Sequence, residues 1–61
     1  MNNFIRIFDI DDNETLLNLN SITNITILDD EQAVILFNSG NFMVIYIDTY
    51  FNILDFLKLN G

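Results

Sequence analysis

The sequence has no cysteine, no histidine, no tryptophan and no proline, and it has only two glycines. Without cysteine and histidine, the chain has neither disulfides nor the ligands of a structural zinc site, which commonly support very small domains. The same absences remove most of the nucleophile and base pairs that enzymes use. We therefore expect no enzymatic activity, no metal site and no cofactor.

Basic residues are almost missing. Only Arg6 and Lys58 oppose nine acidic residues, which gives a net charge of −7. Such a surface repels the phosphates of nucleic acids and anionic membranes, and it attracts basic protein surfaces. We therefore expect a protein partner with a basic surface, and no direct binding to nucleic acid or membrane.

Long apolar segments are absent as well. No stretch approaches the ~18 apolar residues that a membrane span requires. The N-terminal residues Met1, Asn2 and Asn3 lack the basic start of a signal peptide, and no apolar run of the required length follows them. These features predict a cytoplasmic location.

Apolar residues are abundant for so short a chain. The 61 residues allow a single domain, residues 1–61. Such a domain buries only roughly 60% of the surface of its unfolded chain. Because 51% of the residues are hydrophobic and the mean hydropathy is +0.33, some apolar surface is left over. We expect a homodimer or higher oligomer to cover it.

Five apolar runs separated by polar turns predict five short strands. The runs cover residues 4–10, 15–19, 22–28, 33–37 and 42–47. Aspartate and asparagine dominate the intervening segments, where their side chains stabilise turns. The segment 38–41 is the clearest hairpin turn, because Gly40 suits the positive φ of a short loop.

The spacing of apolar residues becomes helical after residue 47. The apolar positions are Tyr50, Ile53, Leu54 and Leu57. Residues 48–49 can cap the helix, and residues 60–61 can end it. The predicted fold is therefore α+β, mainly β: a small curled antiparallel sheet of about five strands with one C-terminal helix packed on it.

The last two predicted strands are apolar on both faces, although a half-exposed strand should alternate apolar and polar residues. One short helix covers one face only. The other face is either the interior of a tightly curled barrel or an oligomer interface, and we favour the interface. Its predicted residues are Phe42, Met43, Val44, Ile45, Tyr46, Ile47 and Phe51.

Seven of the nine acidic residues fall in two predicted turns, and a meander brings these turns to one end of the sheet. They are Asp9, Asp11, Asp12, Glu14, Asp29, Asp30 and Glu31. They form either a patch that binds a basic surface, by imitating nucleic-acid phosphates, or solubilising charge on loops. Residues 9–14 match only part of a calcium loop, since Glu14 replaces its required glycine, and we favour a simple β-turn.

Residues spread along nearly the whole chain carry a resemblance to a known family. They are residues 4–7, 17–20 and 34–37, with Ile22, Ile25, Gly40, Ile53 and Leu57. In these the chain resembles the short flagellar FlbD/SwrD-like family and similar small phage-encoded proteins. The resemblance implies a β-meander with a C-terminal helix and no catalytic residues. The chain departs from that family in its acidity and in residues 47–50, so the likeness concerns the fold more than a flagellar role.

Two functions fit these features. The first is a protein-binding inhibitor or modulator, of the kind that phages encode, which occupies the basic, nucleic-acid-binding surface of a host protein. The alternative is a structural or regulatory scaffold that self-associates through its apolar sheet faces. Salt distinguishes them, because electrostatic docking weakens as ionic strength rises and apolar docking does not.

Overall fold

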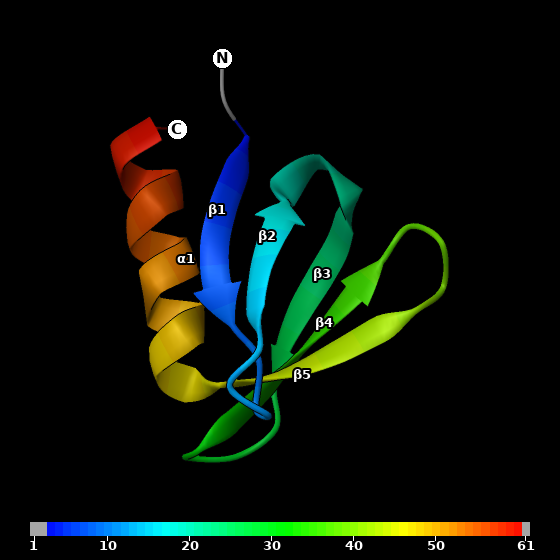
Figure 1. Cartoon of the computed structure of the whole chain (residues 1–61), viewed down its shortest axis with the longest axis vertical. Helices are drawn as coiled ribbons and strands as arrows, with labels where there is room; N and C mark the ends of the chain where they lie inside the picture. Colours follow the sequence, from blue (N-terminus) through cyan, green and yellow to red (C-terminus); the bar gives the residue numbers. More distant parts are fainter. Residues whose placement is uncertain (1–2, 61) are drawn as a thin grey trace.

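The chain forms two antiparallel sheets and a C-terminal helix (Figure 1). This computed structural model describes residues 3–60, and the side chains of residues 3–58. The first sheet is a hairpin of β1 (Phe4–Phe8) and β2 (Glu14–Asn18). A short 3-10 helix, η1 (Leu19–Ser21), leads to the second sheet.

The second sheet has three strands in the order β3-β4-β5, and each strand pairs with its neighbour in the sequence. Its strands are β3 (Ile22–Ile27), β4 (Gln32–Phe37) and β5 (Phe42–Tyr46). The turn between β4 and β5 has Gly40 at φ +92°, a conformation that costs glycine little and other residues much more. The expected hairpin turn at residues 38–41 is therefore confirmed.

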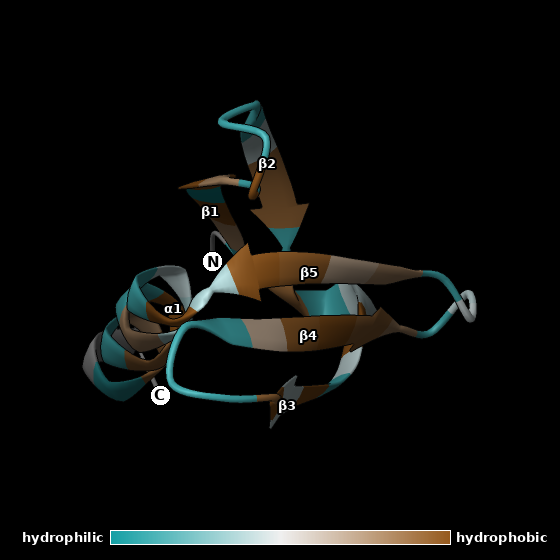
Figure 2. Ribbon diagram, turned by 90° about the horizontal axis from the view of Figure 1, so that it is seen from below, coloured by the Kyte–Doolittle hydropathy of each residue, from teal (hydrophilic) through white to brown (hydrophobic). Residues whose placement is uncertain are grey.

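The core lies where the hairpin, the three-stranded sheet and the helix meet (Figure 2). Strands β1, β2, β4 and β5 contribute buried residues to it, while β3 packs against it through the partly buried Ile22 and Ile25. The buried residues are Ile7 and Leu17 from the hairpin, Ala33, Ile35 and Ile45 from the sheet, and Ile53 from the helix. All six are aliphatic, and no polar side chain among the described residues is buried with them.

Helix α1 (Ile47–Asn60) begins directly after β5 and packs against β1, β4 and β5. Ile53 is its buried residue, at 1% exposure, and Tyr50 packs against the core beside it. Leu57 shares the same predicted face but is 46% exposed. The predicted stop at residues 60–61 lies partly outside the described residues, since these end at residue 60.

The predicted fold class is confirmed: the protein is α+β, mainly β, with five antiparallel strands and one C-terminal helix. The strands form two sheets, whereas the sequence predicted one. The strand ends also differ by one or two residues, most clearly at Ile47, which begins the helix instead of ending the last strand. No helix in the described part of the chain is long and apolar enough to cross a membrane.

Candidate functional site

The turn between β1 and β2 is shaped by one of its own carboxylates. Oδ1 of Asp9 accepts hydrogen bonds from the backbone amides of Asp11 and Asn13, both at 2.9 Å. Asp12 follows with φ 64°, a left-handed conformation that aspartate tolerates better than most residues. Asp9 therefore serves the structure of the turn, and Asp11 and Asp12 remain exposed on it.

The turn between β3 and β4 uses the same device. Oδ1 of Asp29 accepts hydrogen bonds from the amides of Glu31 at 2.8 Å and Gln32 at 2.9 Å. Such bonds between an aspartate and the backbone just after it stabilise turns. In this turn, Asp30 and Glu31 have their carboxylates exposed to solvent.

Both acidic turns are held against the junction between β5 and α1. The hydroxyl of Tyr46 donates a hydrogen bond to the carbonyl of Ile10 in the first turn, at 3.2 Å. The amide of Ile47 donates to the carbonyl of Glu31 in the second turn, at 2.8 Å. The two turns therefore lie at the same end of the molecule (Figure 1), as the sequence predicted. Asp48, in the first turn of α1, adds a further carboxylate at this end.

Five of these carboxylates are exposed and accept no hydrogen bond from the described residues. They are Asp11, Asp12, Asp30, Glu31 and Asp48. We call this set, with the two turns that carry it, the acidic end. Within the described residues, no three acidic side chains come close enough to hold a metal ion. The acidic end is thus a set of separate surface charges.

The two basic residues neutralise little of this charge. Arg6 lies 3.5 Å from Glu14 across the hairpin, and both side chains are mostly exposed, so the pair contributes little to stability. Lys58 lies in the last turn of α1, at the end of the helix away from Asp48. The charge of the molecule is therefore distributed unevenly between its two ends.

The residues predicted to form an oligomer interface divide between two faces. Ile45 is fully buried in the core, and Met43 and Ile47 pack against it. These three side chains therefore pack inside the single chain and do not form a free surface. Phe51 is half exposed on α1.

The other face of β4 and β5 is apolar and faces away from the core. It carries Phe42, Val44 and Tyr46 from the predicted set, with Val34 and Leu36 of β4 beside them. Phe42 is 70% exposed. We call these five residues the outer face. The sequence signal for it was present, since β4 and β5 lack the apolar and polar alternation of a half-exposed strand.

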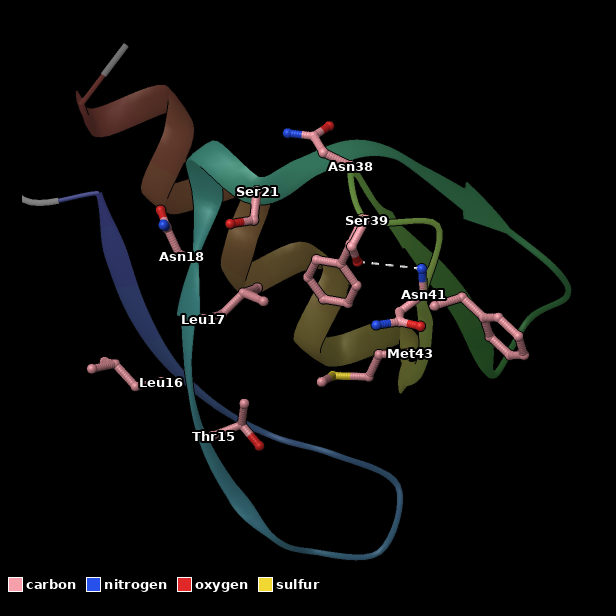
Figure 3. A pocket seen from close by; sticks show the side chains of 11 residues that line it. Thr15, Leu16, Leu17, Asn18, Ser21, Asn38, Ser39, Asn41 and Met43 are labelled. Atoms are coloured by element: carbon pink, nitrogen blue, oxygen red, sulfur yellow. Dashed lines mark hydrogen bonds between the residues drawn. The ribbon is translucent and has the colours of Figure 1, made fainter.

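A groove of about 530 Å³ separates β2 from the start of β5 (Figure 3). Its floor is apolar and includes Leu17, Phe37 and Met43. Figure 3 shows the side chains of Leu17, Asn41 and Met43 pointing toward one another, while Leu16 points away. Sequence reasoning missed this groove, because it forms between strands that are distant in the chain.

The rim of the groove is polar but uncharged. It consists of hydroxyl and amide side chains: Thr15, Asn18, Ser21, Asn38, Ser39 and Asn41. The amide of Asn38 donates to the carbonyl of Asn20 at 3.2 Å, and its oxygen accepts from Thr23 at 2.6 Å. Asn38 thus ties η1 to the β4–β5 turn and holds this end of the groove in place.

Comparison with known proteins gives no family to which the chain can be assigned. No family model matches the sequence, no curated protein matches it, and no solved structure matches the fold.

Proposed function

We propose that this chain is a small protein-binding module that docks its acidic end on the basic, nucleic-acid-binding surface of another protein, and so inhibits or modulates that protein. The observation that carries the proposal is the convergence of the two acidic turns. Tyr46 and Ile47 bind one turn each, so turns that are about twenty residues apart in the sequence present their carboxylates together.

The carboxylates of the two turns have two different roles, and this difference supports the proposed function. Asp9 and Asp29 each accept two backbone N–H groups with Oδ1, so they hold the turns. The five carboxylates of the acidic end are left for a partner. Clustered exposed charge of one sign speeds the encounter with an oppositely charged surface, and this effect weakens as salt screens it.

The hydrogen bonds of the two turns indicate which acidic residues a test should replace. The variant Asp11→Asn, Asp12→Asn, Asp30→Asn, Glu31→Gln removes four exposed charges and leaves Asp9 and Asp29 to maintain the turns. Asparagine also tolerates the left-handed φ of residue 12. The control is Asp55→Asn, which removes a charge from the exposed side of α1.

Affinity capture with the wild-type chain identifies the partner. The amount of partner captured at low and at high salt then measures how strongly binding depends on charge. We expect the quadruple variant to lose the captured protein, mainly through a lower association rate, and the control to retain it. Excess DNA or RNA should release the protein from the wild-type chain. Unchanged association kinetics in the quadruple variant, with the fold verified by circular dichroism, would refute the proposal.

The outer face supports a second candidate function, a scaffold that self-associates. Five neighbouring apolar side chains point away from the core there, and three of them, Leu36, Phe42 and Tyr46, are exposed. Val44→Asp places a charge in the middle of this face without entering the core. Light scattering should show a homodimer or higher oligomer for the wild type at micromolar concentration and a monomer for the variant. A monomer mass for the wild type at every concentration would exclude this function.

A further inference from the structure

The two sheets have four edge strands, and these differ in how far their outer edges are covered or irregular. The edge of β1 lies beside α1 (Figure 1). The pairing of β3 with β4 shifts register between Ile22 and Asn24, an irregularity that disfavours pairing with further strands. No residue in the described part of the chain pairs with the outer edges of β2 and β5, and both strands border the groove.

The free edge of β2 exposes backbone donors and acceptors. The amide of Asp9 donates to the carbonyl of Asn13, and the amide of Leu19 donates to the carbonyl of Asn3. Because bonded pairs alternate in an antiparallel ladder, the odd-numbered residues of β2 bond to β1. The even-numbered Leu16 therefore directs its N–H and C=O groups away from β1, to the open edge.

The free edge of β5 has the same property. The amide of Phe37 donates to the carbonyl of Asn41, so the odd-numbered residues of β5 bond to β4. Phe42 and Val44 therefore direct their N–H and C=O groups to the open edge. No charged residue or proline protects β5.

The lining of the groove restricts what can occupy it. None of its eleven lining residues is charged, although eleven of the 61 residues of the chain are. The side chains of Ser21 and Asn41 make no hydrogen bond to other described residues and are free to bind. An uncharged, partly apolar occupant with hydrogen-bonding groups along its length therefore fits this lining.

We infer that the groove between β2 and β5 is a docking site for an extended, uncharged segment of a partner protein, which adds as a strand to the open edge of β5. Backbone groups of this segment pair with Phe42 and Val44. Alternate apolar side chains then reach the floor formed by Leu17 and Met43. This site is separate from the acidic end, because the β4–β5 turn lies at the opposite end of the sheet from the acidic β3–β4 turn.

Terminally blocked hexapeptides of alternating apolar residues and threonine are suitable probes, with the Val-Thr repeat as the first. On binding, amide hydrogen exchange measured by NMR should slow at least about tenfold at Phe42 and Val44. The matched control is the same peptide N-methylated at every valine, which keeps the side chains and removes backbone donors. We expect it to bind at least about tenfold more weakly.

Two variants of the chain test the groove itself. Asn41→Asp adds a negative charge to its lining, and Asn52→Asp adds the same charge to the exposed side of α1. We expect at least about tenfold weaker peptide binding for the first, because the bound peptide would bury the new charge without a partner, and unchanged binding for the second. The quadruple variant of the acidic end should bind the peptide like the wild type, which separates this test from that of the proposed function.

Three outcomes would overturn the inference. The first is the absence of binding by any of the hexapeptides at millimolar concentration. The second is equal binding of the N-methylated peptide, because the groove would then recognise apolar side chains alone. The third is self-association of the wild-type chain through the groove, seen in light scattering as a mass that rises with concentration. If Asn41→Asp lost this self-association and Asn52→Asp kept it, a second copy of the chain would fill the groove.

Discussion

Replacing Ile53 by alanine tests how the helix is attached to the sheets. Ile53 is the helix residue that belongs to the buried core, and it is 1% exposed. Deleting most of a buried isoleucine side chain costs about 2–5 kcal/mol, through lost burial and the cavity that remains. Alanine is itself an excellent helix former, so the loss reports packing and not helix propensity.

The size of this loss matters because the domain is small. At about 0.05–0.15 kcal/mol per residue, a chain of 61 residues has a free energy of unfolding of roughly 3–9 kcal/mol. Ile53→Ala therefore removes about a fifth of the stability or more. With a urea m-value of about 1 kcal/mol/M, the midpoint of unfolding should fall by about 2–5 M.

The matched variant is Leu57→Ala, on the same predicted face of α1. Because Leu57 is 46% exposed, we expect a loss below about 1 kcal/mol. Urea titrations followed by circular dichroism give both values. Equal losses in the two variants, or a loss below about 1 kcal/mol for Ile53→Ala, would refute the packing described for α1.

Two further predictions concern single positions. Gly40→Ala should destabilise the protein by about 1 kcal/mol in thermal melts, because alanine is strained at φ +92°, while no atom lies within 4 Å of the added Cβ. Restored stability in a chain carrying D-alanine at residue 40 would confirm the conformational cause. Tyr46→Phe should lose about 0.5–1.5 kcal/mol with its hydrogen bond to Ile10, and amide exchange in the β1–β2 turn should quicken. Unchanged exchange there would mean that the bond does not hold the turn.

The sequence was sufficient to predict the elements of the fold because each has a strong local signal. The five apolar runs became five strands, and the change of period after residue 47 became α1. The ends were less predictable. Ile10 continues an apolar run, but Asp9 binds the amides of Asp11 and Asn13 and so ends the strand earlier.

Other features depend on contacts that periodicity does not encode. Ile53 and Leu57 have equivalent spacing on α1, yet their exposures differ greatly, because spacing defines a face and not how far the sheet extends beneath it. Ile45 and Val44 are neighbours in an all-apolar strand, and only the structure distinguishes the core residue from the outer one. The groove was unpredictable for a related reason: the separation of β2 from β5 follows from the division into two sheets.

The strand order has a kinetic consequence. Every strand pairing among the described residues joins neighbours in the sequence, across turns of only four or five residues. Forming each hairpin therefore closes a short loop, and such closures are fast and lose little chain entropy. The chain also has no proline, so slow isomerisation of a prolyl bond does not limit its refolding. Because its strand pairings are local, we expect the chain to fold quickly and to refold as quickly after each unfolding event.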